Sequence, residues 1–240
     1  MPAETSKALA PSALGLKRIR LLEGLQPDAL EQLAQQCRWR RIPGGQRVIS
    51  RAAHDQDVFL IASGRVRVTS FSAAGRQVTY RDFGAGDWFG DFAAIDGLSR
   101  SADVVALDDT LVATMSPTQF RGLLHAHASV CDRMLLRLVT SVRELTERVF
   151  DLSTLGVQNR VHAEMLRLAH ETDVKDNTAH IDPAPKHSEI ASQISTYREQ
   201  VTRELAAMIK QGLVRRDGQA LVIPDVTRLE KIVTDVQRSL

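Results

Sequence analysis

A single long helix is the feature that most constrains this chain, because seven apolar or thiol residues recur along it at alternating spacings of four and three. These residues are Cys131, Leu135, Leu138, Val142, Leu145, Val149 and Leu152. A seam of this period lies along one side of an α-helix and is typical of helices that pack against a second, parallel helix. A helix of about 25 residues is ~37 Å long, which exceeds what is needed to cover one small domain. We therefore expect a dimerisation helix at residues 129–155 and a homodimer, with a core helix of a single domain as the alternative.

The part of the chain before this helix is rich in short β-forming runs. Residues 1–18 begin with a stretch, residues 1–15, that is rich in Ala, Ser and Pro, and they predict a flexible tail. Pro27–Gln36, in contrast, has the apolar spacing of a short helix. The predicted strands, separated by glycines, are Arg47–Ser50, Val58–Ala62, Val66–Phe71, Val78–Phe83 and Val104–Met115. Evenly spaced strands with glycine turns predict a small barrel or jelly roll.

The part after the long helix predicts a helix-turn-helix followed by a hairpin. Gly156 follows the last seam residues and provides a hinge. Two short segments, Ser188–Ile194 and Tyr197–Gln211, each carry an apolar face and are separated by a tight break. The segment Gly212–Ile223 contains an Asp-Gly turn between two short runs and predicts a hairpin. A hairpin behind the second helix is the wing of a winged helix-turn-helix.

The second of these helices exposes side chains that can contact DNA. Thr196 is placed to cap it, and Glu199 three residues later would complete a capping box. Guanidinium and carboxylate groups meet guanine and cytosine edges in the major groove, and basic side chains contact phosphates. The candidate DNA-binding residues are Thr196, Arg198, Glu199, Thr202, Arg203 and Arg216. From residue 156 to 240 there are twelve Lys or Arg and twelve Asp or Glu, so the basic surface has to be local, and the alternative is a helical hairpin with a solvated charged face.

Another cluster of polar residues lies at 89–102, between two predicted strands. Gly90 precedes the acid Asp91, and Arg100 and Ser101 follow in the same segment. A carboxylate accepts a hydrogen bond from a ribose hydroxyl, and a guanidinium beside a hydroxyl can hold a phosphate. A loop and short helix inserted in a rigid β scaffold is a common place for a ligand. The segment therefore predicts a nucleotide sensor, with a surface ion pair of Asp91 and Arg100 as the alternative.

The order of Gly-acid and Arg-Ser-Ala in this segment resembles the phosphate-binding cassette of cyclic-nucleotide-binding domains, whose usual form is Gly-Glu-Leu, an insert, then Arg-Ser/Thr-Ala. Residues 198–203 add Arg-Glu-x-Val-x-Arg, which is similar to the recognition helix of cyclic-AMP receptor proteins. From about Leu21 onward the chain resembles the Crp/Fnr family of bacterial transcription regulators, and especially its cyclic-AMP receptor branch. The resemblance implies an α+β chain with a cyclic-nucleotide-binding β-roll at 19–128, the dimerisation helix at 129–155 and a winged helix-turn-helix domain at 156–240.

The resemblance also implies roles for individual residues. Asp91 would hold a ribose hydroxyl, and Arg100 and Ser101 would hold the cyclic phosphate. The implied nucleotide-binding residues are Gly90, Asp91, Phe92, Arg100, Ser101, Ala102 and Thr146. The residues that would contact the bases of a TGTGA-like half-site are Arg198, Glu199 and Arg203, so that a dimer reads a palindrome. RNA polymerase is the implied protein partner.

Three positions depart from the cyclic-AMP receptor pattern. Asp91 replaces the usual Glu and is one methylene shorter. The two adjacent helix positions that present Thr-Ser to the adenine align with Leu145 and Thr146, so that one hydroxyl is left. The helix arginine that braces the acid aligns with Ser141, although Arg143 is nearby. Cyclic AMP is the favoured effector and cyclic GMP the second, while a response to cyclic di-GMP, independence of nucleotide, and an adaptor that acts on a protein partner are the alternatives.

The composition argues against several other classes of protein. Cys37 and Cys131 are the only cysteines, too few for a disulfide framework, a zinc ribbon or a four-cysteine iron–sulfur cluster. No stretch approaches ~20 apolar residues, and no basic start precedes a long apolar run. The phosphate-binding loop and nucleophile-elbow motifs of common enzymes are missing. We therefore expect a cytoplasmic protein without catalysis, metal, haem, iron–sulfur cluster or membrane association.

Overall fold

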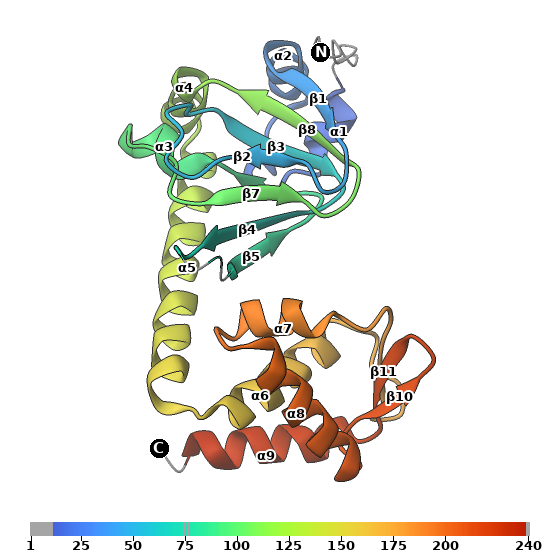
Figure 1. Cartoon of the computed structure of the whole chain (residues 1–240). Helices are drawn as coiled ribbons and strands as arrows, with labels where there is room; N and C mark the ends of the chain where they lie inside the picture. Colours follow the sequence, from blue (N-terminus) through green and yellow to red (C-terminus); the bar gives the residue numbers. More distant parts are fainter. Residues whose placement is uncertain (1–11, 74, 76, 239–240) are drawn as a thin grey trace. The chain divides into compact units, whose positions relative to one another are not determined.

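The computed structural model of the chain describes residues 12–238 except 74 and 76, and it divides into two compact units, Met1–Ser141 and Val142–Leu240. The first unit contains the β-strands predicted before the long helix. The second contains the helix-turn-helix. Figure 1 shows the order of the elements within each unit. The α+β fold class predicted from the sequence is confirmed.

Two four-stranded antiparallel sheets form the first unit (Figure 1). One has the strand order β1-β8-β3-β6 and the other β2-β7-β4-β5. The strands are β1 (Arg38–Ile42), β2 (Arg47–Ile49), β3 (Val58–Ser63), β4 (Val66–Phe71), β5 (Gln77–Phe83), β6 (Trp88–Phe89), β7 (Asp103–Ala106) and β8 (Thr110–Met115). The single run predicted at Val104–Met115 is two strands, one in each sheet. Neither β1 nor β6 was predicted, since β1 is arginine-rich and β6 has two residues.

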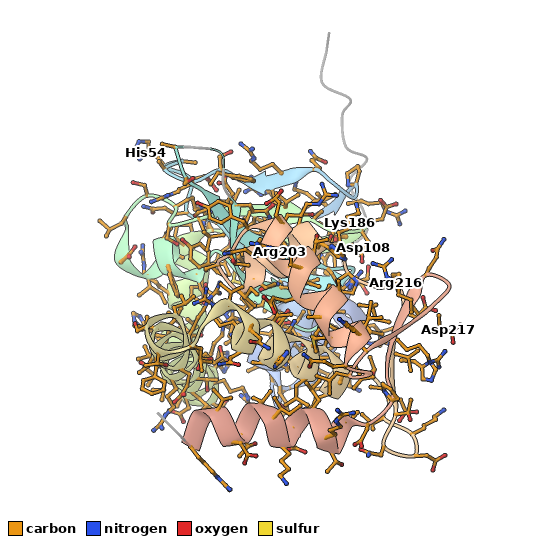
Figure 2. All side chains as sticks on the ribbon, turned by 60° about the horizontal axis from the view of Figure 1, so that its bottom comes forward. His54, Asp108, Lys186, Arg203, Arg216 and Asp217 are labelled. Carbon is orange, nitrogen blue, oxygen red and sulfur yellow. The ribbon has the colours of Figure 1, made fainter. Side chains whose placement is uncertain are left out.

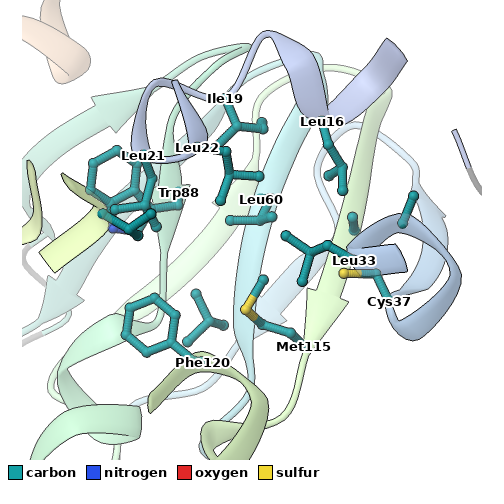
Figure 3. Close-up of a cluster of buried hydrophobic side chains, with 14 of the residues drawn as sticks. Leu16, Ile19, Leu21, Leu22, Leu33, Cys37, Leu60, Trp88, Met115 and Phe120 are labelled. Carbon is teal, nitrogen blue, oxygen red and sulfur yellow. The ribbon is translucent and has the colours of Figure 1, made fainter. Parts of the chain in front are cut away.

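Strand β3 is buried on both faces and joins two separate cores. Successive side chains of a strand point to opposite faces, so Phe59 and Ile61 enter the core between the sheets while Val58 and Leu60 face the helices. Figure 3 shows this second core, in which Leu60 and Met115 of the sheet meet apolar side chains of the flanking helices. The strand is therefore fixed from both sides.

The first helix corrects the predicted tail. Helix α1 (Ala13–Lys17) buries Leu16, and Ile19 follows it into the helix-covered core, so the chain already belongs to the domain within the range 1–18. Residues 1–11 of that range lie outside the described part. The other short helices of this unit are η1 (Arg20–Leu22), α2 (Pro27–Gln36), α3 (Asp91–Asp96) and α4 (Pro117–Ala126).

Helix α5 (Ala128–Thr154) is the long helix that the heptad seam predicted. Its 27 residues correspond to ~40 Å. Cys131 and Leu138 are half-buried, but the other five seam residues are between 36% and 63% exposed. The chain therefore leaves most of its apolar seam uncovered. None of the helices in residues 12–238 is long and apolar enough to cross a membrane.

The second unit consists of helices around a three-stranded sheet of order β10-β11-β9. The helices are α6 (Val157–His170), α7 (His187–Gln193), α8 (Arg198–Lys210) and α9 (Val226–Arg238), and the strands are β9 (Ala179–Ile181), β10 (Arg215–Asp217) and β11 (Ala220–Ile223). The predicted hairpin is β10 and β11. Apolar side chains from all four helices meet in one core, including Val161, Ile190, Val201 and Leu229. This core holds α8 by one face and leaves its other face exposed.

Candidate functional site

The cassette at 89–102 turns sharply between β6 and α3, and the turn requires glycine. Gly90 has φ +86°, a left-handed conformation that L side chains rarely adopt. A Cβ atom there would lie 2.7 Å from the carbonyl oxygen of Asp57 and 2.9 Å from Nη1 of Arg100. Gly90 thus allows the backbone of the predicted cassette to approach the Asp57 carbonyl and the Arg100 side chain closely.

Asp91 is a buried acid whose hydrogen-bonding capacity is not filled. It is 5% exposed, and its Oδ2 atom has no hydrogen-bond partner within the described residues. The nearest cation is Nε of Arg137, 4.0 Å away. Burial raises the pKa of Asp91 above its usual range, while Arg137, the local backbone N–H groups and the Trp88 indole lower it. The site therefore presents a sequestered acceptor that a hydroxyl donor would satisfy.

Arg137 of α5 is the arginine that braces Asp91, and this corrects the alignment. The family alignment places this arginine position at Ser141, which lies one helical turn further along the chain. Arg137 donates from Nη2 to the carbonyl of Trp88 at 2.7 Å, and its guanidinium lies 4.0 Å from the Trp88 ring centroid and 4.6 Å from that of Phe83. Burial lowers the pKa of Arg137, and Asp91 opposes that effect. The role of Arg137 could not be predicted from a local sequence pattern, because the residues that it contacts are distant in the chain.

Arg100, the expected phosphate ligand, is enclosed by protein acceptors. Its side chain is 3% exposed. Nε and Nη2 both donate to Oδ2 of Asp55, at 3.2 and 2.6 Å. Nη1 donates to the carbonyl of Gly90 at 2.9 Å, and Nη2 also donates to that of Asp57 at 2.7 Å. The structure therefore brings Arg100 to the cassette turn as predicted but pairs it with Asp55, which no sequence pattern had included in the site.

The remaining expected nucleotide-binding residues differ in exposure. Ala102 is buried, Ser101 is exposed and Phe92 is 51% exposed. Thr146 is exposed on α5, and its hydroxyl donates to the carbonyl of Val142 at 2.9 Å within the same helix. The Thr146 hydroxyl is therefore a surface group that keeps its acceptor lone pairs.

In the second unit, α7 and α8 form the predicted helix-turn-helix. The turn contains Ser195 at φ +54°, and α8 begins at Arg198 after the N-cap residue Tyr197. Thr196 does not cap this helix as predicted. It is 6% exposed, and its hydroxyl donates to Oε1 of Gln200. The buried Thr196 side chain is thereby removed from the surface available to DNA, and Glu199 is free of a capping role.

The exposed face of α8 carries the other expected DNA-binding residues. Arg198, Glu199, Thr202 and Arg203 are exposed there, and Arg216 is exposed on the β10–β11 wing. Figure 2 labels Arg203 on α8 and Arg216 on the wing. Within the described residues, none of these three arginines forms an ion pair with a carboxylate. Their N–H groups are therefore available to acceptors on DNA.

His187, at the start of α7, was not predicted from the sequence. Its Nδ1 lies 2.7 Å from the hydroxyl oxygen of Thr202, and the Thr202 hydroxyl donates to the carbonyl of Arg198 at 3.0 Å. Partial burial and the charges of Arg216 and Arg198 lower the pKa of His187. Both arginines are therefore within electrostatic reach of one side chain, and the basic surface is local to α8, the wing and the start of α7.

Comparison with known proteins finds a separate match in each unit of the chain. Residues 39–127 match the family model of the cyclic nucleotide-binding domain, and residues 159–232 match that of the Crp-like helix-turn-helix domain. The CRP-like cAMP-activated global transcriptional regulator of Mycobacterium tuberculosis is 24% identical over 90% of this chain and 97% of its own length. The cyclic AMP receptor protein of Thermus thermophilus is 26% identical over 90% of this chain and 98% of its own.

Among solved structures, the c-di-GMP responsive global regulator CLP of Xanthomonas campestris has the same fold. The TM-score is 0.71 at 18% identity, with 83% of this chain and 99% of that chain covered. Together the two domain matches cover more than half of the residues, in the order cyclic nucleotide-binding domain and then helix-turn-helix. The chain therefore belongs to the Crp/Fnr family of DNA-binding transcription regulators.

Proposed function

We propose that this regulator is a homodimer whose affinity for DNA is controlled by a cyclic nucleotide bound at the cassette, with cyclic AMP as the favoured effector. The observation that carries the proposal is the buried Oδ2 of Asp91, which has no hydrogen-bond partner in the described part of the chain and lies beside Arg137. A buried acceptor without a partner costs about 1–3 kcal/mol. A ribose hydroxyl would remove that cost, whereas an apolar ligand would not.

The other contacts of the nucleotide follow from the family resemblance. Arg100 and Ser101 hold the cyclic phosphate, with Gly90, Phe92 and Ala102 beside it. The base meets the long helix, at Thr146 in the register that aligns the bracing arginine with Ser141. If the base-facing pair keeps its spacing from the bracing arginine, which is Arg137, the pair becomes Ser141 and Val142. Separate Thr146→Ala and Ser141→Ala variants distinguish these two registers by their preference between cyclic AMP and cyclic GMP.

The exposed seam of α5 is proposed to pair with the same seam of a second copy. Val142, Leu145 and Val149 are each more than half exposed, and burying such side chains contributes roughly 1.5–3 kcal/mol each. The effector shifts the dimer only if it binds the DNA-competent state more tightly than the other state. A Val142→Glu variant that folds but sediments as a monomer supports this arrangement, and an unchanged dimer contradicts it.

On DNA, Arg198, Glu199 and Arg203 are proposed to contact the bases of a palindromic, TGTGA-like site, with Thr202 and Arg216 on the phosphates. The dimer would place two α8 helices about 34 Å apart, one turn of DNA. RNA polymerase is the proposed protein partner in the cytoplasm.

A regulator that needs no nucleotide is the second candidate, favoured by the pairing of Arg100 with Asp55.

Trp88 provides a direct test of the nucleotide. The chain has two tryptophans, so a Trp39→Phe variant leaves Trp88, which lies against Arg137, as the only indole. Titration with cyclic AMP, cyclic GMP and cyclic di-GMP is expected to change its fluorescence for the true effector. An additional Asp91→Asn change should abolish the response. The affinity for DNA is then measured with and without that effector. If none of the three nucleotides changes this affinity, nucleotide control is rejected.

A further inference from the structure

The guanidinium of Arg100 is almost fully occupied by acceptors of the protein itself. Arginine has five N–H donors, and four hydrogen bonds to described residues already leave from Nε, Nη1 and Nη2. Two of them end on the Asp55 carboxylate and two on the main-chain carbonyls of Gly90 and Asp57. A phosphate that binds a guanidinium in the usual bidentate way needs two parallel N–H groups. One of the present acceptors therefore has to leave before a phosphate can bind there.

The three acceptors are not equally able to leave. The carbonyl of Gly90 belongs to a turn so tight that no Cβ fits, and that of Asp57 directly precedes strand β3. Moving either would disturb the sheet. The Asp55 carboxylate is instead carried by a side chain that is 51% exposed, and rotation about its side-chain bonds would free both N–H groups at once.

The loop between β2 and β3 holds Asp55 at this position. The amide N–H of Ala52 donates to the carbonyl of Arg100 at 2.9 Å, and the amide of Arg100 donates to the carbonyl of Ala53 at 3.0 Å. Nε2 of Gln56 donates to the carbonyl of Gly97, at the far end of α3, at 2.7 Å. The loop is thus hydrogen-bonded to both ends of the cassette insert, so that Asp55 meets Arg100 as part of the fold.

We propose that Asp55 is an internal anion that occupies the phosphate position of Arg100 and that the phosphate of the effector must displace it. The inference rests on the proposed function, because it names the competitor of the phosphate in the same cassette. The competition lowers the apparent affinity by the fraction of molecules in which Asp55 has left. It also makes the site selective for ligands with a negative charge at this point, since an uncharged ligand cannot replace a carboxylate beside a buried guanidinium.

The test compares Asp55→Asn with the wild type and with Asp108→Asn. Asp108 pairs with the exposed Arg65 at 3.0 Å, so the control variant makes the same change in net charge and removes a carboxylate from an arginine elsewhere in the unit. Thermal unfolding is followed in buffer, with inorganic phosphate, and with cyclic AMP or cyclic GMP, and nucleotide affinity is measured by calorimetry. Asp55→Glu, which keeps the carboxylate, should behave like the wild type.

Asp55→Asn is expected to unfold at a lower temperature in buffer, because it leaves Arg100 without its anion. Inorganic phosphate should restore that stability while having little effect on wild type or Asp108→Asn, and the nucleotide should bind Asp55→Asn on the order of tenfold more tightly. An equal response of Asp55→Asn and Asp108→Asn to phosphate, or weaker nucleotide binding by Asp55→Asn, overturns the proposal. If phosphate restores Asp55→Asn but no nucleotide affects any variant, the internal anion stands and nucleotide control fails.

Discussion

The cassette and helix α8 hold their charged groups in opposite ways. Asp91 and Arg100 are each 5% exposed. The guanidinium groups of Arg100 and Arg137 donate hydrogen bonds to oxygen atoms of the protein. Arg198 and Arg203 on α8 are exposed, with no carboxylate paired to either in the part of the chain that the structure describes. Buried charges are tolerated only when they are paired, whereas exposed charges keep their hydration.

This difference separates the consequences of substitution in the two regions. A change in the cassette alters the balance of buried charges, so that stability and ligand binding change together. A change on the exposed face of α8 is expected to remove a contact that forms only with DNA. Stability measurements on matched variants therefore distinguish a site built into a core from a site presented on a surface.

Arg137→Met should give the largest effect on stability. It removes the cation from buried Asp91 while keeping most of the apolar volume against Trp88. Breaking a buried ion pair on one side costs about 3 kcal/mol or more, so the urea midpoint of the first unit should fall clearly. Arg133→Met, one turn earlier on the same helix, is the control. Equal unfolding midpoints for the two variants would mean that Arg137 contributes no more than the half-buried Arg133.

Arg203→Ala should leave stability unchanged and weaken DNA binding. The guanidinium has no carboxylate partner among the described residues, and loss of a base contact costs about 1–3 kcal/mol, or roughly ten- to a hundredfold in affinity. Fluorescence anisotropy with a palindromic duplex measures the loss, and Arg228→Ala on α9 is the control. Undiminished DNA binding by Arg203→Ala would remove α8 as the recognition helix and favour an adaptor that binds protein.

Asp91→Asn should raise stability while it removes nucleotide binding. The folded-state pKa of Asp91 is raised, so the ionised carboxylate at neutral pH is less favourable in the folded chain than in the unfolded chain. A neutral amide of the same shape avoids that cost, and Arg137 still keeps its hydrogen bond to the Trp88 carbonyl and its contacts with the Trp88 and Phe83 rings. The rise should be smaller than the loss in Arg137→Met, whose partner Asp91 is left with no cation beside it. Urea unfolding at neutral pH measures the difference. A lower midpoint for Asp91→Asn would show that the pair with Arg137 outweighs the desolvation of the acid.

The features that the sequence predicted well are those encoded by neighbouring residues. The heptad period predicted α5, the apolar faces predicted α7 and α8, and the Asp-Gly turn predicted the wing. Gly90 and Asp91 could be placed on the cassette turn because they are adjacent in the chain. Each of these signals lies within one element or one turn, where side-chain period and turn chemistry determine the backbone.

The features that the sequence missed depend on contacts between distant segments. Asp55 reaches Arg100 across 45 residues, and Arg137 reaches Asp91 from another element. Neither pairing has a spacing that local periodicity could reveal. Thr196 is a residue type that often caps helices, but it follows the left-handed residue Ser195, and the Thr196 hydroxyl donates to Gln200. Helix α8 begins only at Arg198, two residues after Thr196.

Acid should act in opposite directions on the contributions that one buried group makes to the stability of each unit, and this is the smallest expected effect. His162 of α6 is 4% exposed, its Nδ1 has no hydrogen-bond partner within residues 12–238, and burial lowers its pKa below 6.5 while Glu204 of α8 opposes that shift. The unfolded chain then binds more protons than the folded one just below 6.5, so the contribution of His162 is present above that pH and is lost as the pH falls. Protonation of Asp91, in contrast, favours the folded first unit.

His162→Gln should therefore flatten the acid side of the stability curve of the second unit, measured by thermal unfolding between about pH 5 and 8. The exposed His180 of β9 provides the control, since His180→Gln should leave the slope as it is in the wild type. If both variants keep the wild-type slope, another group causes the acid sensitivity of this unit. If only His162→Gln flattens it, the packing of α6 against the recognition helix depends on a neutral imidazole, and each unit then carries one buried group whose protonation shifts its stability.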